Sequence, residues 1–176
     1  MDAQRPLNET GVLNLQDILQ HAVSILQKYS HLYSYVESNR LDVFIERNHL
    51  KPAIKAILDA KWGHLSAITG LDHPGQPDAS DPQHQKDHLE VLYHFCQKSI
   101  IVTLRVSLDY HDARLPSICD LVPVATLYER ELMEMFGIHI ENTPDPSRLL
   151  LPDDWPSGVY PLRKSFKGLE NTSTMS

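Results

Sequence analysis

Hydrophobic residues recur every three or four positions in two segments of the N-terminal third, which is the pattern of amphipathic helices. The first segment, residues 15–29, follows Asn14, whose side-chain oxygen is suited to cap a helix. The second, residues 49–61, follows Asn48 and carries Pro52 in its first turn, where proline is tolerated. The sequence therefore predicts two helices, each capped by an asparagine.

Apolar residues alternate with polar ones in several later segments, which is the pattern of strands in a half-covered sheet. The last two segments are the strongest and meet at Lys98, so they predict an antiparallel hairpin. A loop is expected at residues 72–86, which are rich in proline and aspartate. The five expected strands are residues 33–37, 41–46, 64–71, 88–97 and 99–108.

A polar turn is expected at residues 109–114. After it, proline and glycine residues indicate where the predicted helices begin and end. Pro123 should separate a short helical piece at residues 118–122, capped by Ser117, from a longer helix at residues 124–136. Gly137 is placed to end that helix in a left-handed C-cap.

After this helix we expect a short strand at residues 138–141 and then an extended segment. The five prolines of residues 144–161 exclude a helix interior or a central strand there. The element order predicts an α+β fold, in which a largely antiparallel sheet has helices packed on one face. We expect this α+β domain over residues 1–137, a proline-rich C-terminal docking arm over residues 138–166, and a flexible tail over residues 167–176.

Composition narrows the classes of function. The 176 residues, 41% of them hydrophobic, suffice for one hydrophobic core. The net charge of −7 disfavours nucleic-acid binding, which needs a positively charged surface. Cys96 and Cys119 form neither a disulfide framework nor a paired metal motif, so we expect buried free thiols in a reducing compartment. No apolar run approaches the ~20 residues of a membrane span, and the N-terminus lacks the apolar stretch of a signal peptide.

Two acids, Glu129 and Glu131, border the apolar face of the helix expected at residues 124–136. One interpretation is a pair of carboxylates for acid–base catalysis, which needs one of them in a shifted environment. The other is structural, with the acids accepting hydrogen bonds from the arm or its basic side chains. The sequence shows no nucleophile, metal motif or phosphate-binding loop nearby, which favours the structural interpretation. Arg130 and Glu134 stand four residues apart, where they are able to pair on the helix surface.

The ten histidines raise the hypothesis of a metal site. A zinc site would need several ligands on one face, and His84 and His88 share a face only if that segment is helical. The residues after His88 alternate as a strand does, and no cysteine completes the set, so the pattern disfavours a metal. The nearest approach to a cluster is His73, His84, His88 and His94.

The arm itself indicates a binding role. Leu149, Leu150 and Leu151 form an apolar run, and Trp155 and Tyr160 are side chains that contribute strongly to protein interfaces. An extended segment this apolar needs a covering surface. That surface is either a partner protein or the sheet of the same chain.

Five motifs in the same region together resemble the signature of one family, the 30-kDa subunit of respiratory complex I, NADH:quinone oxidoreductase. Related subunits occur in membrane-bound, energy-converting [NiFe] hydrogenases, in formate hydrogenlyase-type complexes and in F420H2 dehydrogenases. Residues 156–160, between Trp155 and Pro161, are more similar to the hydrogenase-related branch. The motifs are Glu129-Arg130-Glu131, Met135-Phe136-Gly137-Ile138, Pro144-Asp145, Arg148-Leu149-Leu150-Leu151-Pro152-Asp153-Asp154-Trp155 and Pro161-Leu162-Arg163-Lys164.

The resemblance implies a non-catalytic subunit, peripheral and on the cytoplasmic side of the membrane, that carries no cofactor of its own. Its arm would wrap the large hydrogenase-like (49-kDa type) subunit and lie near the iron–sulfur small subunit and other peripheral-arm subunits. Iron–sulfur clusters, and in hydrogenases a NiFe centre, would belong to these partners, which pass electrons to quinone. The alternatives are the equivalent subunit of a membrane-bound [NiFe] hydrogenase or formate hydrogenlyase-type complex, and an independent metalloprotein using the histidine-rich loop.

The resemblance also implies which residues serve the interface. Glu129, Arg130 and Glu131 would brace the junction between helix and arm, and Gly137 would permit the turn. The full set of expected interface and structural residues is Glu129, Arg130, Glu131, Phe136, Gly137, Arg148, Leu149, Leu150, Leu151, Trp155, Pro161, Leu162, Arg163 and Lys164.

Overall fold

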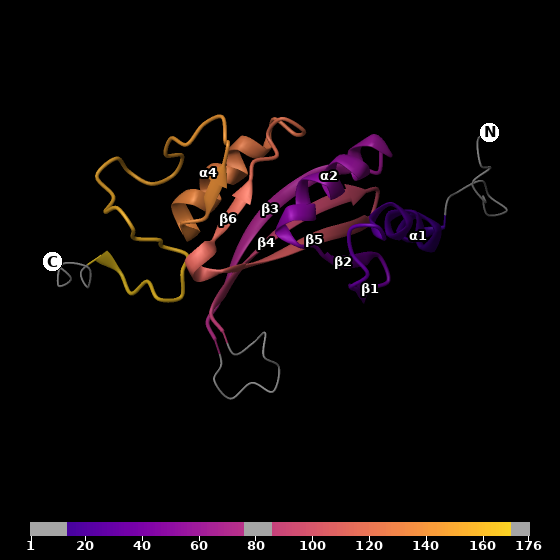
Figure 1. The fold of residues 1–176 in the computed structure, drawn as a ribbon, viewed down its shortest axis with the longest axis horizontal. Coiled ribbons are helices and arrows are strands. Elements are labelled where there is room, and N and C mark those ends of the chain that lie inside the picture. Colours follow the sequence, from indigo (N-terminus) through magenta and orange to yellow (C-terminus); the bar gives the residue numbers. More distant parts are fainter. Residues whose placement is uncertain (1–13, 76–85, 170–176) are drawn as a thin grey trace. The chain divides into compact units, whose positions relative to one another are not determined.

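The computed structural model describes residues 14–75 and 86–169, which form three α-helices, two short 3-10 helices and seven strands (Figure 1). The helices are α1 (Leu15–Leu26), η1 (Arg47–His49), α2 (Leu50–Asp59), η2 (Tyr110–Asp112) and α4 (Ala125–Phe136). The strands are β1 (Tyr33–Glu37), β2 (Arg40–Phe44), β3 (His64–His73), β4 (His88–Gln97), β5 (Ile100–Asp109), β6 (Arg114–Pro116) and β7 (His139–Glu141).

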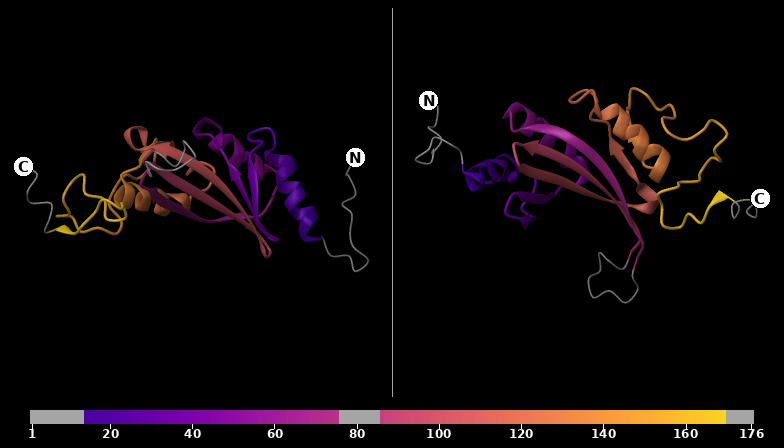
Figure 2. Two further views of the ribbon diagram at one scale, coloured as in Figure 1. Left: turned by 90° about the horizontal axis from the view of Figure 1, so that it is seen from below. Right: turned by 180° about the vertical axis from the view of Figure 1, so that it is seen from behind.

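Five of the strands form one sheet in the order β1-β2-β5-β4-β3, and the long strands β3, β4 and β5 lie side by side in both views of Figure 2. The β1–β2 pair is antiparallel, whereas β2 and β5 are parallel, with Leu41 opposite Val102 and Val43 opposite Leu104. A parallel pair needs a long connection, and α2 with the β3–β4 hairpin supplies it. The predicted α+β class with a largely antiparallel sheet is confirmed, and the five-stranded sheet includes the parallel pair of β2 and β5.

The described residues divide into two compact units. The first contains residues 14–67 and 92–106, and the second contains residues 68–75, 86–91 and 107–169. The division passes through β3, β4 and β5, so each unit includes part of these strands.

In the first unit, α1 and α2 pack together, and both helices, β2 and β5 contribute buried apolar residues to the core. The Trp62 indole N–H donates to the Ile18 carbonyl over 3.0 Å, which ties the end of α2 to α1. Asn14 caps α1 as predicted, since its side chain accepts from the Gln16 amide.

The predicted cap of α2 is wrong, because Asn48 lies inside η1 and the N-cap residue of α2 is His49, without a side-chain hydrogen bond. The His49 amide bonds the Glu46 carbonyl, and the Leu50 amide bonds the Arg47 carbonyl. The 3-10 turn therefore satisfies amides that a side-chain cap would otherwise serve.

In the second unit, two short predictions need correction. The helical piece expected at residues 118–122 is a pair of turns in which the Leu121 and Val122 amides both donate to the Ile118 carbonyl. The polar turn expected at residues 109–114 contains η2 and the first residue of β6, which pairs in parallel with β7. β3 also extends to His73, so the expected loop at residues 72–86 starts later, and residues 76–85 lie outside the described residues.

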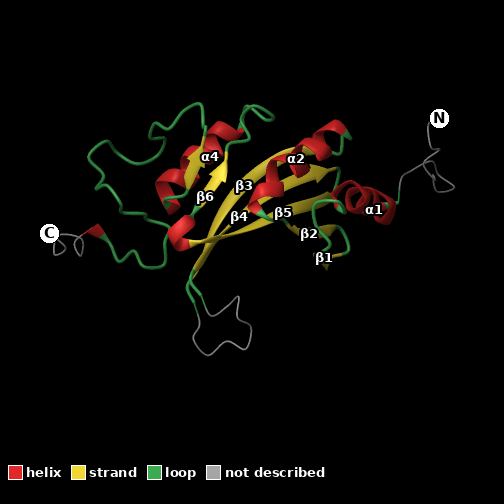
Figure 3. Ribbon diagram, viewed as in Figure 1, coloured by secondary structure: helices red, strands yellow, loops and turns green. Residues whose placement is uncertain are grey.

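The end of α4 agrees with the prediction. Gly137 has φ 66° in the left-handed region, and its amide donates to the Leu132 and Met133 carbonyls. Beyond β7, residues 142–168 form turns and irregular backbone, which is drawn as loop in Figure 3. The chain therefore leaves α4 through a sharp turn, forms β7 and then continues without helix or strand through the predicted arm (residues 138–166).

Candidate interaction site on helix α4 and the C-terminal arm

α4 is anchored in the second unit by one apolar face. Leu132 and Phe136 of this face are at most 5% exposed, and both approach Gly70 of β3 so closely that a Cβ there would overlap them. Glycine at position 70 therefore lets the helix lie against the strand. The opposite face of the helix is left for polar contacts.

Glu129 is 1% exposed and stabilises the turn before α4. Its carboxylate accepts from the Ile118 amide at 2.7 Å and from the Ser117 hydroxyl at 2.9 Å. The Cys119 thiol is the third donor, with Sγ 3.2 Å from Oε2. This buried carboxylate thus bonds the 117–119 turn and not the arm, which is the arrangement of a structural acid.

Burial raises the pKa of the Cys119 thiol, and the neighbouring Glu129 carboxylate acts in the same direction. A thiol with a raised pKa stays protonated at neutral pH and is able to donate to Glu129. Cys119 therefore acts as a hydrogen-bond donor in this turn. Both cysteines are free and half-buried.

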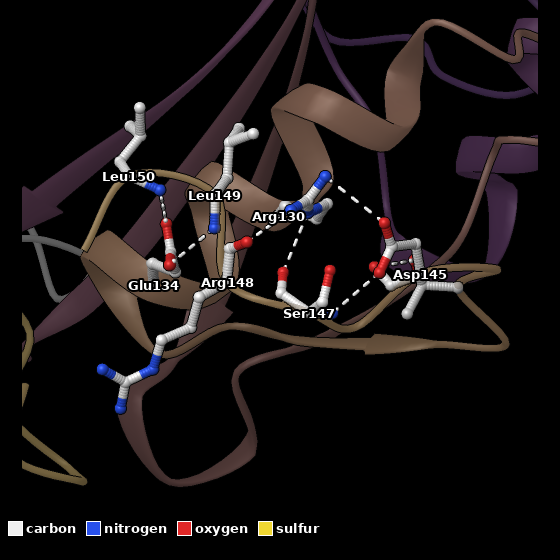
Figure 4. A network of polar contacts seen from close by, with 8 residues as sticks. Arg130, Glu134, Asp145, Ser147, Arg148, Leu149 and Leu150 are labelled. Carbon is white, nitrogen blue, oxygen red and sulfur yellow. Dashed lines mark hydrogen bonds and ion pairs between the residues drawn. The ribbon is translucent and has the colours of Figure 1, made fainter. Parts of the chain in front are cut away.

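Arg130 and Glu134 do not pair with each other; both bond the backbone of the arm (Figure 4). Arg130 Nε donates to the Ser147 carbonyl at 2.8 Å, and its second guanidinium nitrogen donates to the Arg148 carbonyl. The guanidinium also lies 3.3 Å from the Asp145 carboxylate. One helix residue thus holds three parts of the arm.

The Glu134 carboxylate accepts from three successive backbone amides. Oε1 accepts from Leu149 at 2.8 Å and from Leu151 at 3.4 Å, and Oε2 accepts from Leu150 at 2.9 Å. Backbone groups in an irregular segment need partners when they leave water, and a single carboxylate supplies them here. Figure 4 shows the Leu149 and Leu150 side chains extending away from that of Arg148.

A second anchor holds the far end of the arm. Arg163 Nε donates to the Phe136 carbonyl at 2.7 Å, and its guanidinium lies 4.9 Å from the Tyr110 ring centroid and 5.0 Å from that of Tyr160. Such cation–π contacts stabilise a guanidinium held between rings. The Leu162 amide adds a bond to the Met135 carbonyl at 3.2 Å.

Asp72, at the end of β3, completes this anchor. It is 7% exposed, accepts from the Lys164 amide at 2.6 Å, and accepts from the Tyr110 hydroxyl. Because the arm meets Asp72 by a backbone amide, the bond does not depend on the lysine side chain.

The remaining predicted residues lie between the two anchors. Arg148 donates to the Pro152 and Trp155 carbonyls, and the Trp155 indole N–H donates to the Val159 carbonyl at 2.8 Å. The Trp155 and Phe166 ring centroids are 6.1 Å apart. Leu149, Leu151, Trp155 and Pro161 are half-buried, Lys164 is exposed, and Leu150 and Leu162 are 59% and 50% exposed.

Glu131 is half-buried and makes no hydrogen bond or ion pair with residues 14–75 or 86–169. The structure therefore separates the charged triplet by role: Glu129 bonds a turn, Arg130 bonds the arm, and Glu131 bonds neither. Glu134, Asp72 and Tyr110 are contacts of the arm that the sequence did not assign. Glu134 follows Arg130 by four residues on the same helix, and this spacing could have identified it as a contact of the arm. No local sequence feature identifies Asp72 as such a contact, because it lies 92 positions from Lys164.

The histidines of the metal hypothesis are dispersed. In the second unit the His73 and His88 rings stack at 4.7 Å, and His73 Nε2 lies 3.1 Å from Glu90. His94 belongs to the first unit, where it bonds the Thr103 hydroxyl and burial lowers its pKa. His84 lies outside the described residues, among which no group of three or more metal-ligating side chains occurs.

Among the described helices, none is long and apolar enough to cross a membrane. The family model described as the 30-kDa subunit of the respiratory-chain NADH dehydrogenase matches residues 43–172, which include α4 and the arm. The chain belongs to this family.

Relatives in this family come from several complexes. Formate hydrogenlyase subunit 5 of Escherichia coli is 30% identical over 75% of this chain, and a subunit of the F420H2 dehydrogenase of Methanosarcina mazei is 28% identical over 75%. Membrane-bound hydrogenase subunit beta of Pyrococcus furiosus is 51% identical over 31% of the chain. The matched regions span 22%, 78% and 32% of these relatives, so this chain corresponds to only part of the first and third.

Two solved structures share the fold. A trypsin-resistant fragment of Nqo5 covers 74% of this chain and 98% of its own, with a TM-score of 0.58 and 26% identity. A chain of the membrane-bound sulfane sulfur reductase, an archaeal respiratory membrane complex, covers 88% of both chains with a TM-score of 0.69 and 21% identity. The second likeness is one of fold alone.

Proposed function

We propose that this chain is a non-catalytic subunit of a complex I-type oxidoreductase and that its arm holds together the subunits that transfer electrons. One observation carries the proposal: the arm uses its backbone to bond its own domain, while Leu150 and Leu162 present their side chains to solvent. Exposed leucines on a segment held in place are suited to enter pockets of another protein.

The arm is then an ordered surface before assembly begins. Arg130 and Glu134 hold one end, and Asp72 and Arg163 hold the other. Ordering a segment costs conformational entropy, so a segment already ordered binds with a smaller loss. The bonds at both ends of the arm therefore favour a mechanism in which the arm docks on its partner as a preformed surface and does not fold upon binding.

The proposed partners are a large hydrogenase-like subunit of the 49-kDa type and a small iron–sulfur subunit, which would carry the redox centres. The chain itself would hold no cofactor and would sit at the cytoplasmic face of the membrane as a peripheral subunit. Family membership and the names of the relatives, which include a membrane-bound hydrogenase and an F420H2 dehydrogenase, support this assignment. The electrons would pass to quinone, or to protons if the complex is of the hydrogenase type.

The test is assembly in the native host. A tagged chain replaces the chromosomal copy, detergent-solubilised membranes are affinity-purified, and the large and iron–sulfur subunits are quantified by mass spectrometry. We expect the double variant Leu150→Asp, Leu162→Asp to lose these subunits while its thermal unfolding stays near that of the wild type, since both side chains are already in water.

Leu32→Asp is the matched control, because Leu32 is 61% exposed and lies in the first unit. Recovery of both subunits with the double variant at the wild-type level would refute the role of the arm. Stoichiometric iron, nickel or zinc in the purified chain alone would refute the assignment of all redox centres to the partners.

A further inference from the structure

The solvent-facing side of α4 carries apolar residues that the fold of the second unit does not use. Leu127 is 47% exposed and stands opposite the buried face formed by Glu129, Leu132 and Phe136, and the N-cap residue Val124 is 50% exposed. A solvent-facing helix surface is normally polar. Two large apolar side chains there indicate a surface that another protein covers.

The arm covers only the C-terminal half of this side of the helix. It crosses α4 at Arg130 and Glu134, the residues that bond its backbone. Val124 and Leu127 precede Arg130, the first residue of the crossing, by about one to two helical turns. The exposed side chain of Leu150 lies at the crossing itself, since its amide bonds Glu134.

Glu131 lies within the crossing, between Arg130 and Glu134. It follows Leu127 by one turn and precedes Glu134 by three residues, so all three share a side of the helix. The residue is half-buried, and its carboxylate makes no hydrogen bond or ion pair with the described part of the chain. A carboxylate at the rim of an apolar surface favours a cationic group on whatever covers that surface.

We propose that Val124, Leu127, Glu131 and Leu150 form one docking surface for a partner subunit that presents an arginine flanked by apolar side chains. The arginine would pair with Glu131, and its apolar neighbours would cover Val124 and Leu127. A guanidinium fits better than an ammonium, because it is more weakly hydrated and binds a carboxylate through two parallel hydrogen bonds. This inference rests on the proposed function, since it names the chemistry by which a partner is recognised.

A second copy of this chain is a poorer occupant of the surface. Two copies related by a two-fold axis would bring their Glu131 side chains into one interface. Each chain also carries a net charge of −7, so like charges would oppose the contact. A different protein that presents a basic side chain avoids both of these repulsions.

The test uses the tagged chain in its native complex, purified from solubilised membranes as above. Leu127→Asp places a charge in the apolar part, Glu131→Arg reverses the charge, and Glu131→Gln keeps the shape without the charge. We expect Leu127→Asp and Glu131→Arg to lower recovery of the large and iron–sulfur subunits about tenfold, which is the loss typical of one interface anchor. Glu131→Gln should fall between wild type and Glu131→Arg.

Matched controls separate this surface from general damage. Leu32→Asp and Glu46→Arg make the same changes at exposed positions in the first unit and should leave recovery unchanged. Thermal unfolding of each purified chain is measured alongside and should stay near that of the wild type, because Leu127 is 47% exposed and Glu131 makes no hydrogen bond or ion pair with the described residues. Recovery of Leu127→Asp and Glu131→Arg at the wild-type level would overturn the proposal, and recovery of Glu131→Gln at that level would overturn the ion pair.

A photo-crosslinking amino acid at position 127 then identifies the occupant. We expect a crosslink to a partner peptide that contains an arginine, and Arg→Glu there should restore assembly of Glu131→Arg. A crosslink to a second copy of this chain would overturn the proposal. Leu162→Asp tests the arm alone: if it releases the partners while the α4 variants do not, the proposed function stands and this inference fails.

Discussion

Glu134→Gln should loosen the start of the arm without unfolding the domain. Three backbone amides depend on this carboxylate. Glutamine removes the charge and leaves one acceptor oxygen in place of two. The bond to Leu151 is long, at 3.4 Å, and Leu150 is exposed, so the loss is that of about one charge-assisted hydrogen bond. We expect roughly 2 kcal/mol of local destabilisation.

Hydrogen exchange of the purified chain measures this loss directly. A local change of roughly 2 kcal/mol lowers the protection of the Leu149 and Leu150 amides about 30-fold, because each 1.4 kcal/mol is tenfold. Amides in β4 should keep their protection, since the domain core is not altered. Glu131→Gln is the matched control on the same helix and should leave all of these amides unchanged.

Two results would refute the reasoning. Unchanged exchange at Leu149 and Leu150 in Glu134→Gln would mean that the carboxylate does not hold the arm. Faster exchange throughout β4 as well would mean that Glu134 supports the whole domain, and its bonds would then not act on the arm alone.

The other predictions concern the far anchor, the thiol and the turn after α4. Asp72→Asn should lower the protection of the Lys164 amide about tenfold by exchange, since a charged acceptor becomes neutral. Alkylation of Cys119 should reach half its maximal rate at a higher pH than that of a free cysteine, because burial raises the pKa of this thiol and only the thiolate reacts; a profile equal to that of free cysteine would contradict this. Gly137→Ala should lower stability by about 1–2 kcal/mol in chemical unfolding, since alanine is strained at φ 66° and its Cβ would overlap the Tyr160 ring.

The fold was predictable where a signal is local. Alternation gave β4 its observed bounds, His88–Gln97, and Gly137 marked the end of α4 because a left-handed C-cap favours glycine. The cap of α2 was not predictable from Asn48, because a preceding 3-10 turn satisfied the same amides by backbone. The parallel pairing of β2 with β5 was also missed, since pairing between distant strands leaves no local pattern.

The candidate site was predictable as a region but not contact by contact. The motifs placed the arm next to α4, and Arg130 bonds it as expected of a residue at that junction. Helical spacing suggested a pair between Arg130 and Glu134, a contact of a few tenths of a kcal/mol at an exposed surface. The arm offers both side chains backbone partners in place of each other, and such charge-assisted hydrogen bonds are stronger. The spacing of residues along one helix does not show that backbone groups of another segment will bond these side chains instead.

The backbone of the arm and its exposed side chains have different roles. Its backbone carbonyls and amides bond Arg130, Glu134 and Asp72, and such bonds are the same whatever side chain the residue carries. The side chains of Leu150 and Leu162 are thereby left free to differ with the partner. The exposed side chains and Glu131 would then determine which partner subunit binds. The bonds from Arg130, Glu134 and Asp72 would keep the arm ordered.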